Sequence, residues 1–241
     1  RVDISERRVL YQSEIVFTPL LDAETVDVAR LMEFIQGEYK VAGVLPSQVE
    51  TGAVIITGET AKKKNADEIL KAAAGLAGDF VVTVAGPNVE SLIAGRGSGA
   101  AEYSRQHFTT LTNVDIGGGS ANSAVFKQGA LVAAAAMNYG GRVIEFNPSG
   151  AIRHITRPGE LILEQVGLRL RIGDRPGLAD LVKVCDCMAG LTLELIEGSA
   201  SPLAQKLYLT PPASDASQVT PRKFAGGIGR WYYDHQPARS R

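Results

Sequence analysis

The sequence has little cysteine and no long apolar segment. Its two cysteines are Cys185 and Cys187. A CxC spacing is not that of a zinc-binding or thioredoxin-like motif, and both residues fall in a helical pattern, so we expect reduced cysteines in a cytosolic protein. The longest apolar run, 129–137, is far shorter than the roughly 18 residues that suggest a membrane span. The sequence therefore predicts neither a disulfide framework nor a membrane protein.

An excess of basic charge is also missing. The formal net charge is −1, so the sequence predicts no nucleic-acid partner. The phosphate-loop pattern GxxxxGK[ST] does not occur, which excludes a P-loop protein. GRGSGA (95–100) resembles part of a dinucleotide fingerprint, but it follows a helical pattern instead of a strand and so lacks the context that a dinucleotide site needs.

What the sequence does contain is an alternation of strands and helices, which indicates an α/β fold. The first part opens with a strand-like segment at 7–19, which ends at Pro19. Buried strands at 52–58 and 79–86 then alternate with helical patterns that start near residues 28, 65 and 87. Three consecutive strands follow within 111–138, then a hairpin with its turn at 148–150. A long helix is expected over 177–197, with Asp174 as its cap and Gly198 as its stop. We expect two lobes, residues 1–110 and 111–241.

The most informative stretch is NVDIGGGSANSAVF, residues 113–126, in which three glycines separate two strands. Without Cβ atoms, successive backbone N–H groups can form a concave nest that binds phosphate, here Gly117, Gly118 and Gly119. A carboxylate next to phosphates requires a cation, so Asp115 indicates Mg²⁺-nucleotide. Ser120 and Asn122 could bond phosphate oxygens or orient a water. The alternative is a tight glycine hairpin with Asp115 as a simple turn acid.

Two other glycine groups are candidates for the same site. NYGGR (138–142) ends a strand, and its Gly140 and Gly141 form either a second phosphate nest or a plain turn. FAGGIG (224–229) follows a short strand-like segment. Bare backbone of this kind suits a flat ligand such as adenine or ribose. Its glycines are Gly226, Gly227 and Gly229.

The order DIGGG-S-x-N, two further strands, GG and a distal FAGGIG resembles the nucleotide-binding core of the actin, sugar-kinase and heat-shock-chaperone ATPase superfamily. In that fold two ribonuclease-H-like lobes clamp Mg-ATP. The resemblance implies that residues 115–122 form the second phosphate motif and that the FAGGIG glycines form the adenosine motif. It implies ATP and Mg²⁺ as cofactors, with Asp115, Ser120 and Asn122 as catalytic residues and Asp115 at the metal.

A narrower resemblance covers almost the whole chain. VLYQSEIVFTPL, GAVIITGETAKKKNA, GDFVVTVAGPNVESLIAGRGSGA, NVDIGGGSAN and FAGGIGRWYY together resemble the EutA family of ethanolamine-utilisation proteins. Members of that family are chaperone-like ATPases that reactivate ethanolamine ammonia-lyase by promoting exchange of damaged adenosylcobalamin. The resemblance implies that lyase as the partner and a cytoplasmic location, and it leaves open an association with a bacterial microcompartment.

The sequence also departs from these patterns. The superfamily's first phosphate hairpin, of DxGTT type, has no counterpart in the chain, and the family continues beyond the adenosine motif, so we expect a central fragment or a protein whose ends are not represented. Ser120 and Asn122 stand where the heat-shock chaperones carry Thr and Asp. The loss of an acid near the metal argues against fast hydrolysis and leaves a slow ATPase as the expectation.

Three other functions remain open on the sequence alone. A small-molecule kinase of the same superfamily would need a catalytic base beside an acceptor pocket, and no convincing DxG-type base stands out in the first lobe. The second alternative is an actin-like scaffold that polymerises. The third is a degenerate interaction module that binds no nucleotide.

Overall fold

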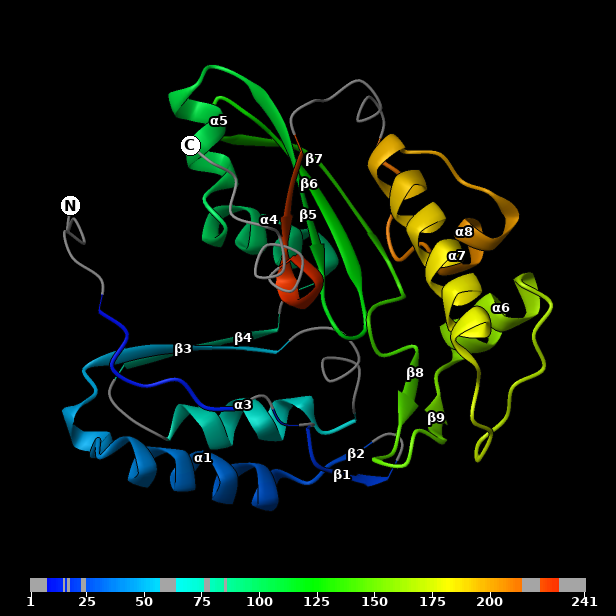
Figure 1. Cartoon of the computed structure of the whole chain (residues 1–241). Helices are drawn as coiled ribbons and strands as arrows, with labels where there is room; N and C mark the ends of the chain where they lie inside the picture. The colour runs from blue at the N-terminus through cyan, green and yellow to red at the C-terminus, as the bar shows by residue number, and fades with distance from the viewer. Residues whose placement is uncertain are drawn as a thin grey trace, which may run out of the picture. The chain divides into compact units, whose positions relative to one another are not determined.

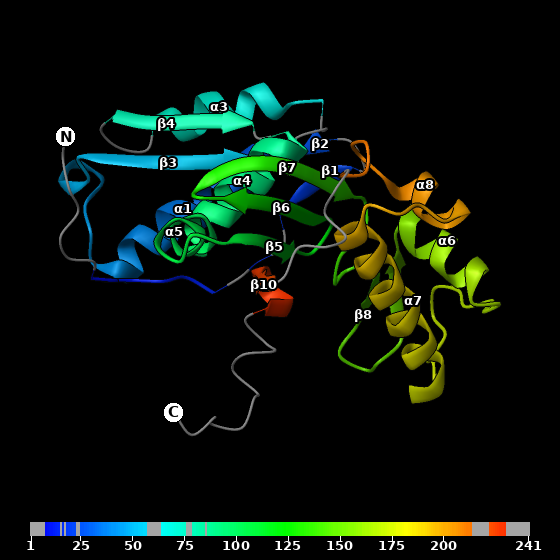
Figure 2. The same ribbon diagram turned by 90° about the horizontal axis from the view of Figure 1, so that it is seen from above.

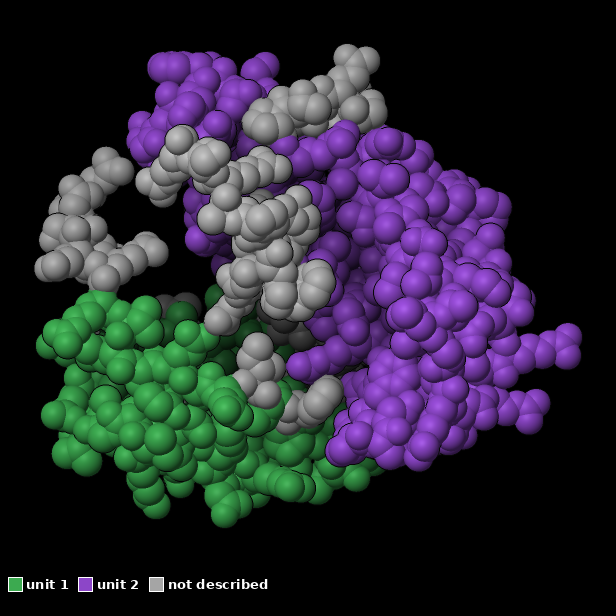
Figure 3. Space-filling model, in the orientation of Figure 1, with its two compact units in different colours: residues 1–85 green, residues 86–241 purple. Residues whose placement is uncertain are grey.

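The computed structural model describes residues 8–14, 16, 18–22, 25–56, 64–75, 79–84, 86–213 and 222–229, with only the backbone described at 66 and 79–84. The chain divides into two compact units, residues 1–85 and 86–241, which are coloured separately in Figure 3. The second unit begins with two helices that pack on its own sheet, so this division falls earlier than the expected lobe boundary at residue 110. That boundary stays a prediction.

The first unit contains two short sheets and two main helices. Its described elements are β1 (Leu20–Asp22), β2 (Thr25–Val26), α1 (Val28–Ala42), the 3-10 helix η1 (Pro46–Gln48), β3 (Thr51–Ile56), α3 (Ala66–Ala74) and β4 (Asp79–Val84). β1 and β2 are antiparallel, whereas β3 and β4 are parallel and in continuous register. The helices predicted near residues 28 and 65 and the two predicted strands are therefore found, but β3 alternates between exposed and less exposed residues and is not a buried strand. The strand expected over residues 7–19 is not found in its described part, 8–14.

Local chemistry explains how this unit holds together. The Asp27 carboxylate caps α1 by accepting a hydrogen bond from Arg30 N at 3.0 Å. The buried side chain of Asn65 accepts from Val26 N and donates to Val26 O, at 2.9 and 2.8 Å. Asn65 therefore ties β2 to the start of α3. The small core around these bonds contains Val26, Ile56 and Ile69.

The second unit is built on a four-stranded sheet in the order β10-β5-β6-β7. Its elements are α4 (Pro87–Gly97), α5 (Ala100–Gln106), β5 (Thr110–Ile116), β6 (Ala121–Lys127), β7 (Ala130–Met137), β8 (Ile144–Phe146), β9 (Ile152–Ile155), α6 (Arg157–Gln165), α7 (Leu178–Glu197), α8 (Pro202–Leu207) and β10 (Arg222–Ala225). β5, β6 and β7 form an antiparallel meander, and β10 lies parallel to β5 (Figure 1). This strand order is that of a ribonuclease-H-like lobe, and the α/β class expected from the sequence is confirmed.

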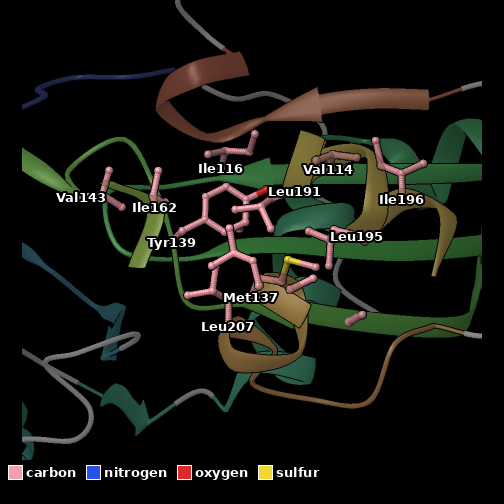
Figure 4. Close-up of a cluster of buried hydrophobic side chains, with 14 of the residues drawn as sticks. Val114, Ile116, Met137, Tyr139, Val143, Ile162, Leu191, Leu195, Ile196 and Leu207 are labelled. Atoms are coloured by element: carbon pink, nitrogen blue, oxygen red, sulfur yellow. The ribbon is translucent and has the colours of Figure 1, made fainter. Parts of the chain in front are cut away.

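Helices cover both faces of this sheet, with α4 and α5 on one face and α7 and α8 on the other (Figure 2). The side chains of β6 alternate accordingly: Phe126 packs with α5 residues, while Val125 belongs to the larger core on the α7 side. Figure 4 shows that larger core, in which Tyr139 lies among residues of the sheet and of α7. The Tyr139 hydroxyl forms a 2.7 Å hydrogen bond with Thr192 Oγ1 of α7.

Two further features complete the fold. β8 and β9 form the predicted hairpin, and Gly150 in its turn has a φ of +80°. Cys185 and Cys187 lie on α7 as free cysteines, as expected. Within the part of the chain that the structure describes, no helix is long and apolar enough to cross a membrane.

Candidate nucleotide site

The three adjacent glycines form the turn between β5 and β6. Gly117 N donates a 3.0 Å hydrogen bond to Ser120 O, which closes the turn. The carbonyl oxygens of Gly117 and Gly118 accept hydrogen bonds from Gly141 N and Arg142 N, both at 2.9 Å. Among the described residues, the N–H groups of Gly118 and Gly119 have no acceptor. The carbonyl groups of Gly117 and Gly118 are therefore hydrogen-bonded within the protein, whereas two N–H groups of the loop are left to bind a ligand.

The fold itself does not require glycine throughout this turn. None of the three has a positive φ, although the two-residue turns that usually close such hairpins need one or two residues with positive φ. A Cβ on Gly119 would meet no atom within 4 Å, and one on Gly117 would meet its nearest atom, Ser120 O, at 3.7 Å. Only Gly118 would meet a close neighbour, Arg142 Cδ at 3.1 Å. Bare backbone at Gly117 and Gly119 without an internal steric reason favours a ligand-binding loop over the tight-turn alternative.

Gly140 and Gly141 lie directly against this loop. A Cβ on Gly140 would be only 2.6 Å from the oxygens of Gly117 and Gly118, so the two backbone segments touch here. Gly141 is exposed, and its N–H is used to hold Gly117. The sequence suggested this pair as a second phosphate nest or a plain turn. In the structure, the pair supports the 117–119 loop by lying against the side that carries its carbonyl oxygens.

The FAGGIG segment reaches the same place from β10. The register pairs Ala225 with Asp115, and β10 gives way to a single helical turn at 226–229. Gly226 has a φ of +73°, and a Cβ there would lie 2.5 Å from both Asp115 Oδ1 and Ile116 O. Gly227 has open space around it, whereas a Cβ on Gly229 would lie 2.9 Å from the carbonyl carbon of Phe224. Close approach therefore requires glycine at 226 and 229, and Gly227 is left bare.

A row of polar side chains lies beside the loop, on the α4 face of the sheet. Asp115 and Asn122 are directly opposite each other in the β5–β6 register. Asn122 Nδ2 donates to Ser120 Oγ at 3.2 Å, and Ser120 Oγ donates to Glu90 Oε1 of α4 at 3.4 Å. Asn122 is 1% exposed, and its Oδ1 has no hydrogen-bond partner in the described structure. An orphaned buried acceptor of this kind points to a water or ligand at this position.

The environment disfavours ionisation of both carboxyl groups. Burial raises the pKa of Asp115. Burial also raises the pKa of Glu90, the negative charge of Asp115 adds to the effect, and hydrogen bonds from Ser120 and Asn122 act in the opposite direction. Two carboxyl groups with raised pKa values beside a bare glycine loop can hold a cation or accept a proton.

Glu90 is the site residue that the sequence interpretation missed. It lies in the first turn of α4, where an acid is ordinarily explained by the helix dipole. α4 brings it to the sheet because Gly95 lets the helix approach closely: a Cβ on Gly95 would lie 2.1 Å from Phe126 Cε2. The one available signal was its position in the segment before the glycine loop.

Comparison with known proteins identifies the family of the chain. The model of the family described as ethanolamine utilisation protein EutA matches residues 1–241. The chain is 40% identical over 241 residues to a protein of Escherichia coli K12 named ethanolamine ammonia-lyase reactivase EutA, covering 99% of the chain and 51% of that protein. A protein of the same name from Salmonella typhimurium LT2 is 38% identical over 240 residues, with 99% and 51% covered.

The chain thus spans about half the length of the curated relatives it matches. Among solved structures, it is similar to an Aquifex aeolicus member of the Ppx/GppA family, with a TM-score of 0.48, 16% identity, and coverage of 88% of this chain and 55% of that one. Because the family model matches from the first residue to the last, the chain belongs to the EutA family of ethanolamine-utilisation proteins.

Proposed function

We propose that the protein is an ATP-dependent reactivating factor that promotes exchange of damaged cobalamin on ethanolamine ammonia-lyase. The observation that carries this proposal is the family match over the whole chain, supported by 40% identity to a protein named as that reactivase. The lyase is then its protein partner and sets its location, since the two must meet in the same compartment. No feature of the described site favours the kinase or scaffold alternatives.

The convergence of three glycine segments supports nucleotide binding. The loop at 117–119 presents two N–H groups that have no acceptor among the described residues, and such groups suit phosphate oxygens. Gly226 lies against Asp115, so the proposed adenosine motif and the phosphate motif meet at the carboxyl ends of the neighbouring strands β10 and β5. We assign Gly227, which has open space around it, to the nucleoside side of this site.

The residues present fit Mg²⁺. Among the described residues, no cluster of three or more His, Cys, Asp or Glu side chains could form an all-protein metal cage. Mg²⁺ is usually held by one or two carboxylates together with phosphates and waters, and Asp115 is such a carboxylate. Asp115 would hold the ion, which would neutralise phosphate charge when bound.

The same polar row can handle a proton. Burial raises the pKa of Glu90, which is the direction that suits a general base, and Ser120 and Asn122 are hydrogen-bonded to it or to each other. Asn122 Oδ1, which has no partner among the described residues, can accept a hydrogen bond from a water placed between it and Glu90. The chain thereby supplies the groups for the slow ATP hydrolysis that we propose.

A reactivation assay tests the function directly. Ethanolamine ammonia-lyase blocked by an inactive cobalamin is incubated with the intact protein, intact adenosylcobalamin, ATP and Mg²⁺, and ammonia release is measured. We expect recovery of activity that depends on ATP. Recovery no greater than in the ATP-free control, with protein shown to be folded, contradicts the proposal.

A further inference from the structure

Arg142 is held at the glycine loop by its own backbone. It comes directly after Gly140 and Gly141, in the segment that follows β7. Its N–H donates to Gly118 O at 2.9 Å. The neighbouring bond from Gly141 N to Gly117 O has the same length. Gly140 allows this approach, because any Cβ there would clash with the loop backbone. The start of the Arg142 side chain is therefore fixed relative to the loop.

The side chain itself runs across Gly118. A Cβ placed on Gly118 would lie 3.1 Å from Arg142 Cδ, 3.4 Å from Nε and 3.5 Å from Cγ. The atoms next to the guanidinium group thus border the bare Cα of the middle glycine. Arg142 is partly buried, and the course of its side chain over Gly118 brings its charge close to where a phosphate on the loop would sit.

The charges around the loop explain why a cation is needed here. Asp115 and Glu90 would both repel a phosphate chain. Lys223, on β10, is directed elsewhere, since its Nζ donates to Ser98 O at the far end of α4 from Glu90. A guanidinium group offers planar paired donors that match phosphate oxygens.

We propose that Arg142 binds the phosphate chain of the nucleotide over Gly118, so that it sets the preference of the site for nucleoside polyphosphates over nucleosides. This inference rests on the proposed nucleotide site, but it assigns to Arg142 a role that the glycine motifs do not carry. It predicts that removing the guanidinium group weakens the binding of a nucleotide more strongly the more phosphates that nucleotide carries.

Calorimetry on the intact protein with Mg²⁺ and three probes, ATP, ADP and adenosine, tests this. Arg142→Met keeps the aliphatic part that covers Gly118 and removes the charge. We expect it to weaken ATP binding about 10-fold or more, the loss of at least one charge-assisted hydrogen bond, while adenosine affinity changes less than about twofold. The ATP affinity of Arg142→Lys should fall between that of the unchanged protein and that of Arg142→Met. The matched control is Arg175→Met, at an exposed arginine in the loop before α7, and should bind all probes unchanged.

The outcomes separate this inference from the proposed function. If the unchanged protein binds neither ATP nor ADP, the nucleotide site and the role of Arg142 are both wrong. If it binds ATP and Arg142→Met binds equally well, only the role of Arg142 is wrong. Equal weakening of ATP and adenosine would show that Arg142 merely packs against the loop. Should Arg142→Met fail to fold, Arg142→Lys and Arg142→Gln provide the same comparison.

Discussion

Glu90 of α4 and Asp115 of β5 lie close enough that the negative charge of Asp115 adds to burial in raising the pKa of Glu90. Ser120 donates a hydrogen bond to Glu90 and accepts one from Asn122, which lies opposite Asp115 in the β5–β6 register. A folded protein gains no stability from two neighbouring carboxylates that resist ionisation. Their proximity is instead typical of a functional site, where charge is concentrated for a ligand at the expense of stability.

Replacing Glu90 with Gln should therefore stabilise the protein at neutral pH. The folded state raises the pKa of Glu90 above its ordinary 4.5, so it binds more protons than the unfolded state between the two values. Stability then falls as pH rises through this window, and the favourable contribution is complete only below pH 4.5. Thermal unfolding should show a higher Tm for Glu90→Gln at pH 7, with the gain shrinking toward pH 4.

The control for this pH dependence is Glu164→Gln, at an exposed position on α6. It should leave the pH profile of Tm unchanged. A Tm for Glu90→Gln that is lower than that of the unchanged protein at pH 7 would show that Glu90 is stabilised as a carboxylate, contrary to the direction of its pKa shift.

Glu90→Gln should also separate nucleotide binding from hydrolysis. The amide can still occupy the position beside Ser120, but it cannot accept a proton. General-base catalysis is typically worth 10²–10⁴-fold, so we expect the ATPase rate to fall by about that factor. ATP affinity should change much less. Phosphate release under single-turnover conditions measures the rate, and undiminished hydrolysis would exclude Glu90 as the base.

Gly119→Ala distinguishes a ligand loop from a structural turn. The new methyl group has open space and the backbone has an ordinary φ, so the substitution should not destabilise the fold. Compatible Gly→Ala changes typically add about 0.4–1 kcal/mol to the free energy of unfolding. A methyl group on the loop should nevertheless weaken ATP binding, as measured by calorimetry.

The matched control is Gly190→Ala on the exposed side of α7, where a Cβ also meets nothing within 4 Å. It should give a similar stabilisation with unchanged ATP affinity. If both variants bind ATP as the unchanged protein does, the bare surface of Gly119 has no role in nucleotide binding.

The sequence predicted the parts of the fold that depend on local chemistry. The glycine turn of the β8–β9 hairpin and the stop of α7 at Gly198, which has a φ of +70°, follow from backbone geometry that glycine adopts readily. The predicted cap of α7 was wrong. Gly177 is the N-cap, and the Asp174 carboxylate instead accepts a hydrogen bond from Arg171 N at 2.7 Å. Aspartate closes such local turns as readily as it caps helices, so the position of Asp174 in the sequence could not distinguish between these two roles.

Within the site, the glycine motifs were visible in sequence but their contacts were not. That Gly140 touches the backbone of Gly118, and Gly226 the side chain of Asp115, depends on which strands become neighbours. The role of Glu90 depends on how closely α4 packs on the sheet, which the pairing of Gly95 with Phe126 determines. Such long-range contacts leave no periodic pattern in a single sequence.

Gly140→Ala should damage both the fold and the site, because the structure has no room for its methyl group. The Cβ would lie 2.6 Å from backbone atoms of Gly117 and Gly118, and backbone cannot move aside as a flexible side chain can. Overpacking of this kind costs about 1–3 kcal/mol, and here the strain acts directly on the two bonds that hold the loop. We expect a lower free energy of unfolding in urea together with weaker ATP binding.

Gly141→Ala is the neighbouring control, since its nearest contact, at 3.5 Å, is with the side-chain atom Ile228 Cδ1. An exposed position with an ordinary van der Waals contact should tolerate the methyl group within about 0.5 kcal/mol. Because the two variants differ by one position in the same segment, a difference between them isolates the contact with the loop. Equal stability and equal ATP affinity of Gly140→Ala and Gly141→Ala would mean that the 138–142 segment does not support the loop, and the proposed placement of Arg142 over Gly118 would lose its basis.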